Sequence, residues 1–63
     1  MKPKDVIKIL KADGWYELPG GQTSHKQFKH PDKKGKVTVA VHPGDIPPPT
    51  LKAIAKQAGI RLA

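Results

Sequence analysis

TSHKQFKHPDKKGKVTVAVH, residues 23–42, is the segment that decides the fold of this chain. Its second half alternates Val37, Val39 and Val41 with smaller or polar residues, which is the period-2 pattern of a half-buried strand. Its first half has one large apolar residue, Phe28, so the two halves share a core only if Phe28 and the valines point the same way. The segment is therefore predicted to be a β-hairpin with one apolar face and one open face.

The length of the loop determines which residues of the hairpin face each other. With a loop over residues 31–36, the predicted pairs are His30 with Val37, Phe28 with Val39 and His25 with His42. Two histidines then meet on the open face. A slip of two residues would leave them diagonal on that face, whereas a slip of one would bury the polar side chains.

The rest of the chain predicts two helices and one more strand. The expected elements are a helix over Lys2–Asp13 capped by Gly14, a strand over Trp15–Leu18, a turn over Pro19–Gln22, an extended connector over Pro43–Pro49, and a helix that Thr50 caps and Gly59 closes. We expect a single domain over residues 1–63 with an α+β fold of order α-β-β-β-α. Its three-stranded antiparallel sheet is expected to carry both helices on the Phe28/valine face. The core is thin, because a chain of this size buries only about 60% of its unfolded surface.

The charge balance of the chain favours a polyanionic partner. The 63 residues include 12 lysines and arginines against 5 acidic residues, for a formal net charge of +7. Such a surplus is typical of nucleic-acid binding, although a solvated lysine-rich surface gives the same composition. The chain has no cysteine, which excludes disulfides and thiolate zinc sites. With no apolar run long enough to cross a bilayer and no signal-peptide pattern, we expect a cytoplasmic protein with no membrane partner.

The open face of the hairpin carries the chemistry that the sequence offers. Its members are His25, Gln27, Lys29, Thr38, Ala40 and His42. An imidazole can take a proton in one step of a reaction and return it in another, and lysines can stabilise charge on a phosphate. RNA cleavage needs these functions, since a base acts at the 2′-hydroxyl and an acid at the leaving 5′-oxygen.

Other interpretations of these residues stay open. An exposed strand histidine is more often a surface residue than a catalyst. Two cross-strand histidines can also bind zinc, but no third ligand falls on that face, so we expect no metal and no cofactor. Ser24 points to the core side and is expected to support the strand end rather than to act as a nucleophile. His30 is expected to pack against Pro31 or bond the loop backbone, and Trp15 and Tyr16 to pack in the core or at an edge.

Several stretches of the chain together carry a family resemblance. They are Val6–Leu10, Asp13–Trp15, Ser24–Pro31, Val37–Val39 with His42, Thr50–Lys52 and Ile54–Gly59. In them the chain closely resembles the HicA family, the toxin half of HicA/HicB toxin-antitoxin pairs. The resemblance implies a fold like the double-stranded RNA-binding domain and a metal-independent ribonuclease that cleaves mRNA, arrests translation and is neutralised by a HicB antitoxin. It also maps the family's essential histidine, which lies in a Gly-Ser-His motif, onto His25, with Thr23 in place of the glycine.

We therefore interpret the chain as the toxin of a type II toxin-antitoxin system, an endoribonuclease with His25 as general acid/base and His42 and Ser24 in support. The predicted RNA-binding residues are Lys26, Lys29, Lys33, Lys34 and Lys36. Of these, Lys26 is placed on the core-facing side of its strand by the alternation of side chains. The expected partners are mRNA and a HicB-like antitoxin. Two alternatives stay open: a non-catalytic RNA-binding module that uses the same basic face, and a protein whose basic face binds an acidic protein partner.

Overall fold

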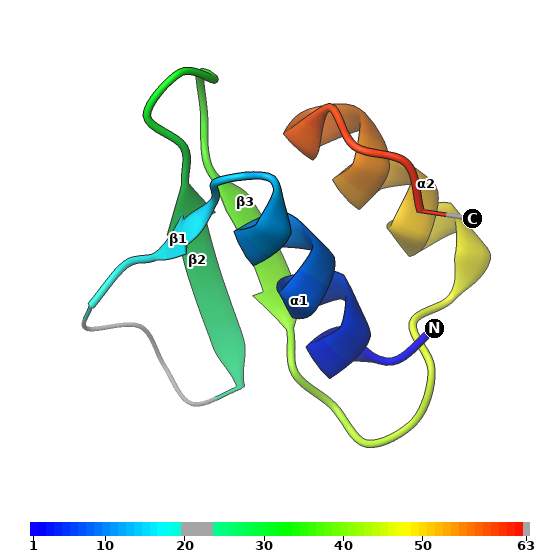
Figure 1. Ribbon diagram of the computed structural model, residues 1–63. Helices are drawn as coiled ribbons and strands as arrows, with labels where there is room; N and C mark the ends of the chain where they lie inside the picture. The colour runs from blue at the N-terminus through cyan, green and yellow to red at the C-terminus, as the bar shows by residue number, and fades with distance from the viewer. Residues whose placement is uncertain (20–23, 63) are drawn as a thin grey trace.

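The computed structural model describes residues 1–19 and 24–62, which form two helices and a three-stranded sheet (Figure 1). In chain order the elements are α1 (Pro3–Ala12), β1 (Tyr16–Glu17), β2 (His25–Lys29), β3 (Val37–Ala40) and α2 (Pro48–Ala58). This order and the antiparallel pairing of the strands confirm the predicted fold class. Most of the turn predicted over Pro19–Gln22, and Thr23, lie outside the described residues.

The central strand of the sheet is β2, with β1 on one side and β3 on the other. The residue pairs between β2 and β3 are His25 with Ala40, Lys26 with Val39, Gln27 with Thr38 and Phe28 with Val37. The predicted pairs His30–Val37, Phe28–Val39 and His25–His42 are therefore wrong by two residues. A shift of two keeps every side chain on its own face, so the apolar and open faces are those predicted.

The side chain of His30 explains the shift in register. The prediction counted His30 as the last paired residue of its strand, but its ring turns back into the loop. There Nδ1 accepts the N–H of Asp32 at 3.0 Å and the N–H of Lys33 at 3.3 Å. The chain therefore leaves the sheet after Lys29. The last residue of β2 that pairs with β3 is Phe28, opposite Val37, so the stretch between paired residues is two residues longer than predicted.

The second helix begins three residues earlier than predicted. Pro47 is its N-cap and Pro48 its first residue, so the prediction that Thr50 caps the helix is wrong. Proline fits this position because its fixed φ is helical and the N–H that it lacks has no partner in a first turn. At the other end Gly59 closes α2 with a left-handed φ of 64°, as predicted.

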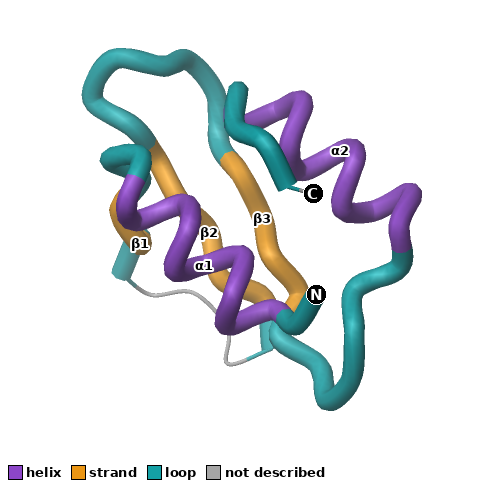
Figure 2. Tube along the Cα trace, turned by 45° about the vertical axis from the view of Figure 1, so that its right-hand side comes forward, coloured by secondary structure: helices purple, strands orange, loops and turns teal. Residues whose placement is uncertain are grey.

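Both helices bury their apolar sides against the same face of the sheet. Figures 1 and 2 show α1 in front of the sheet and α2 alongside β3. The buried core consists of Val6, Leu10, Trp15, Phe28, Val37, Val39, Ile46, Ile54 and Ala58. This set joins residues of both helices to the valine face, as predicted, and no described helix covers the opposite face. Neither α1 nor α2 has the length and apolar character needed to cross a membrane.

The ring of His30 joins the end of α1 to the hairpin loop. Because Nδ1 accepts the two loop amides, Nε2 carries the proton and donates to the Asp13 carbonyl at 2.7 Å. The buried Trp15 packs edge-on against this ring, with ring centroids 5.3 Å apart. Gly14 is the residue that allows the approach: a Cβ there would lie 2.7 Å from Nε2, and its φ of +106° is left-handed.

Lys33 ties the same corner to the end of α2. Its ammonium donates to the Asp13 carboxylate at 2.6 Å and to the Ala58 carbonyl at 2.9 Å. One cation therefore pairs with the acid that follows α1 and also satisfies a carbonyl at the C-terminal end of α2. We call Asp13, His30 and Lys33 the helix clasp, because they hold the ends of both helices against the hairpin loop.

The helix clasp should make the stability of the fold sensitive to acid. The hydrogen bond and charge of Lys33 hold the pKa of the Asp13 carboxyl below its usual value of 3.8. Because this pKa is lower in the folded than in the unfolded chain, Asp13 stabilises the fold above pH 3.8, and this stabilisation is lost as the pH falls through the folded pKa. Asp13→Asn should therefore melt at a lower temperature than the parent at about pH 7, and the difference should shrink towards about pH 2.

Thermal unfolding followed by circular dichroism across this pH range measures the effect. Asp32→Asn is the matched control, since it removes a carboxylate from the hairpin loop that forms no ion pair in the described part of the chain. A melting-temperature difference between Asp13→Asn and the parent that stayed constant at every pH would contradict the role given to the carboxylate.

Candidate functional site

The uncovered face of the sheet gathers side chains from all three strands. Strand pairing and alternation place on it Tyr16, His25, Gln27, Lys29, Thr38 and Ala40. All of them are exposed except Ala40, which is half-buried. We call this set the open face. It contains the residues predicted on β2 and β3, and β1 adds Tyr16.

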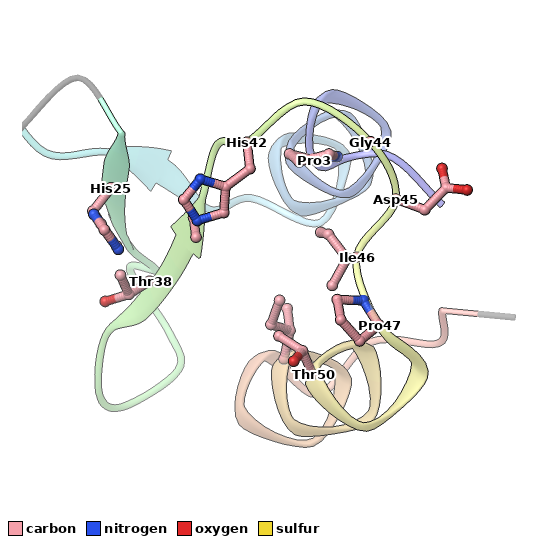
Figure 3. A pocket seen from close by; sticks show the side chains of 11 residues that line it. Pro3, His25, Thr38, His42, Gly44, Asp45, Ile46, Pro47 and Thr50 are labelled. Atoms are coloured by element: carbon pink, nitrogen blue, oxygen red, sulfur yellow. The ribbon is translucent and has the colours of Figure 1, made fainter.

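His25 and His42 meet at one end of the open face. Their ring centroids are 6.0 Å apart and their planes are at 90°, although the direct partner of His25 is Ala40. The contact survives the shift in register because His42, just beyond β3, lies diagonal to His25 (Figure 3). Two imidazoles at this separation can reach different oxygens of one phosphodiester, given a hydrogen-bond reach of about 2.6–3.2 Å for each.

The hydroxyl of Ser24 contacts the ring of His25. Its Oγ lies 3.2 Å from Nδ1. A hydroxyl both donates and accepts hydrogen bonds, so Ser24 can hold the ring whether or not Nδ1 carries a proton. Nε2 has no hydrogen-bond partner among residues 1–19 and 24–62, and it is the nitrogen free to exchange a proton with a ligand.

The five lysines predicted to bind RNA separate into two groups. Lys29 is exposed on the open face, and Lys34 and Lys36 are exposed in the hairpin loop. Lys26 lies on the apolar side of the sheet, where its ammonium is 3.1 Å from a glutamate of β1, and Lys33 belongs to the helix clasp. The structure therefore leaves the first three exposed to solvent and holds the other two in ion pairs within the chain.

Tyr16 is a candidate that reasoning from the sequence missed. It is 50% exposed, whereas its neighbour Trp15 is buried, and its pairing with Lys29 puts both side chains on the open face. The alternation of side chains along a strand could have identified Tyr16, because two adjacent aromatic residues of one strand cannot both face the core. An exposed ring beside a lysine is suited to stack on an unpaired nucleic-acid base.

The third histidine does not join the other two. The ring of His30 is held in the helix clasp, as the expected bond to the loop backbone indicated. Within the described residues there is also no group of three histidine, cysteine, aspartate or glutamate side chains that could share a metal ion. The two exposed imidazoles are therefore those of His25, on the open face, and His42, at its end, and both line a pocket of about 340 Å³.

Residues 3–60 match a protein-family model described as the HicA toxin of bacterial toxin-antitoxin systems. The chain belongs to the HicA toxin family. The matched range contains all of the open-face residues, the helix clasp and the whole of both helices.

A solved structure extends the similarity to three dimensions. A chain of a toxin-antitoxin complex from Streptococcus pneumoniae shares 32% of its residues with this one and superposes with a TM-score of 0.79. The alignment covers 95% of this chain and 98% of that chain. No curated protein sequence matches the chain. The shared fold thus accounts for nearly the whole length of both aligned chains.

In this member of the HicA family the two faces of the sheet differ in what they carry. The core and the helix clasp lie on the helix-covered side, and the exposed imidazoles and Lys29 lie on the other. A ligand can therefore reach His25 without displacing any residue that holds the fold together.

Proposed function

We propose that this HicA-family toxin is an endoribonuclease that cleaves mRNA and arrests translation, with His25 as general acid/base. The proposal rests on the position of His25: it is exposed on a basic face, edge-on to His42, and held through Nδ1 by Ser24. Its place in the Ser-His segment that resembles the family motif supports the same role.

The cleavage step follows from two imidazoles beside one phosphodiester. A neutral imidazole takes the proton of the ribose 2′-hydroxyl, the 2′-oxygen attacks the phosphorus, and the bond from phosphorus to the 5′-oxygen breaks. A protonated imidazole returns a proton to the departing 5′-oxygen, which leaves a 2′,3′-cyclic phosphate and a 5′-hydroxyl. His25 carries one transfer and His42 supports the other. These transfers need no metal and no cofactor.

The open face also offers contacts for the RNA strand on either side of the cleaved bond. Lys29 lies four residues from His25 along β2, about 13 Å at about 3.3 Å per residue. Tyr16 stands opposite Lys29, so an RNA strand that follows β2 meets a cation for its phosphates and a ring for its bases. Lys34 and Lys36 extend the cationic surface into the loop. This arrangement suits a single strand, whose bases are free to stack.

An acidic HicB-like antitoxin is the second partner that we propose. The net charge of +7 favours an acidic partner, and the similar chain from Streptococcus pneumoniae belongs to a toxin-antitoxin complex. A standard interface buries about 800 Å² on each partner, roughly a fifth of the 4485 Å² accessible surface of this chain. Such a partner can silence the toxin by covering the open face.

Replacement of His25 tests the catalytic proposal. His25→Ala should abolish RNA cleavage and growth arrest while changing RNA affinity by less than about tenfold, because the ring transfers protons but contributes little to binding. Cleavage of a labelled RNA in the presence of EDTA and equilibrium binding of the same RNA measure the two effects. His42→Ala should cause a smaller loss of cleavage.

A His25→Ala chain that cleaves at the parental rate would remove His25 from the mechanism. If the parental chain bound RNA without cleaving it, the non-catalytic RNA-binding module would be the better description. Activity lost in EDTA and restored by zinc or magnesium would show that a metal takes part.

The salt dependence of RNA affinity tests the two groups of lysines. Lys29→Gln, Lys34→Gln and Lys36→Gln should each lower the slope of log affinity against log salt by about 0.7, since each lysine neutralises one phosphate of a single strand. Tyr16→Ala should weaken binding by about 1–3 kcal/mol through lost stacking and leave the slope unchanged.

Lys52→Gln is the matched control, because Lys52 is exposed on α2, away from the open face. Lys26→Gln should also have little effect, given its ion pair with Glu17. Equal slopes for all of these variants would mean that the loop lysines form only a solvated surface.

Hydrogen exchange of the co-expressed complex tests how the antitoxin acts. Direct covering should slow exchange of the amides around His25 and in the hairpin loop, and the melting temperature should rise with antitoxin concentration by mass action. Protection of α1 and α2 with unchanged exchange around His25 would instead indicate inhibition from a distance.

A further inference from the structure

A pocket of about 340 Å³ lies between the sheet and the start of α2, and the proposed cleavage step uses only His25 and His42 among its lining residues. Figure 3 shows His25, Thr38 and His42 on the sheet side, with Ile46, Pro47 and Thr50 on the side of the connector and α2. The volume is at the lower end of the range of small-ligand sites, about 300–1,000 Å³. The pocket therefore has room for one ring system rather than for a folded partner.

The lining of this pocket is mostly apolar. Its apolar surface comes from Pro3, Ile46, Pro47 and Ile54, and Thr38 and Thr50 also line it. No lysine or arginine of the described residues lines it, although the chain has a net charge of +7. The carboxylate of Asp45 points away from the pocket and lies 3.9 Å from the Met1 amino group. The pocket therefore offers no ammonium to bind a phosphate. Its apolar and hydrogen-bonding groups suit a flat ring with polar edges.

The free edge of β3 adds backbone groups to the pocket. The N–H of Val41 donates to the Ser24 carbonyl at 2.7 Å, so the valine positions of β3 turn their amides towards β2, and Thr38 and Ala40 turn theirs away. Thr38 and Ala40 both line the pocket, and neither has a backbone hydrogen bond on that side within the described residues. Nucleobases carry donors and acceptors side by side along their edges, which complements the edge of a strand.

We propose that this pocket binds the base of the nucleotide next to the cleaved phosphate. The inference rests on the proposed function, because a phosphate between His25 and His42 brings the adjoining base to a pocket that both rings line. In single-stranded RNA that base is free of the stack and able to turn into the protein. The pocket then gives cleavage a preference for the nucleotide at one position.

A peptide strand of an antitoxin is the rival occupant, since an exposed strand edge can accept another strand. The surroundings favour a base. β3 has only 4 residues and α2 contacts it, so little free edge is left for pairing with a second strand.

Titration of the ¹⁵N-labelled chain with the four nucleoside 3′-monophosphates tests the pocket without any cleavage. Nucleotides should shift the amide signals of Thr38 and Ile46, whereas ribose 5-phosphate, which has no base, should shift only signals around His25 and His42, including that of Ala40, which pairs with His25. Absence of the first set of shifts, or the same set with ribose 5-phosphate, would overturn the proposal.

Two substitutions at Thr50 test the same site from the helix side. Thr50→Phe, which fills the pocket, should weaken nucleotide binding by about tenfold. Thr50→Val keeps the shape and removes the hydroxyl, so it should give a smaller loss and serves as the test if the larger ring disturbs α2. Ala53→Phe is the control, because Ala53 is exposed on α2 outside the pocket. Parental affinity in both Thr50 variants would refute base binding.

The outcomes separate this proposal from the proposed function. If the chain cleaves no RNA but nucleotides shift the pocket amides, the base-binding pocket stands and the ribonuclease does not. If the chain cleaves RNA and the pocket amides respond only to the antitoxin, the ribonuclease stands and base binding is wrong.

Discussion

The fold depends on one histidine ring that is fixed at both of its nitrogens. His30 accepts two loop amides through Nδ1 and donates through Nε2 to the end of α1. A chain of 63 residues has a small core. Hydrogen bonds at this corner therefore help to hold together elements that apolar packing alone would hold in a larger domain. Lys33 extends the corner to α2, and elements distant in sequence meet at one point.

Strand parity and loop geometry divide residues of one type between structure and chemistry. Of the three histidines, His30 turns into the helix clasp, and His25 and His42 stay on the solvent side. The lysines divide in the same way, because Lys26 and Lys33 are engaged with carboxylates of the chain itself. The net charge of +7 therefore overstates the number of cations that a ligand on the open face can use.

The sequence predicted the two faces of the hairpin correctly because side-chain direction follows from the period of the backbone alone. It did not predict the register, which depends on His30. This residue does not pair with β3, and its ring accepts hydrogen bonds from the loop amides instead. Nor could spacing reveal that Lys33 bonds a carbonyl 25 residues further along, a contact that exists only in the folded chain. The helix start was missed because proline suits both an extended connector and a first helical turn. Tyr16, by contrast, could have been placed on the open face from parity alone.

The connector between β3 and α2 decides the shape of the pocket before any ligand arrives. Ile46 is anchored by its N–H to the Met1 carbonyl at 2.8 Å, and Pro47 follows with φ −59° and ψ 145°. A proline has no N–H to donate and a fixed φ. The connector therefore neither collapses onto the free edge of β3 nor pairs with it as a fourth strand. The cavity is thus preorganised: the entropy of ordering its wall is lost when the chain folds, and a ligand that enters meets a site already in its binding shape.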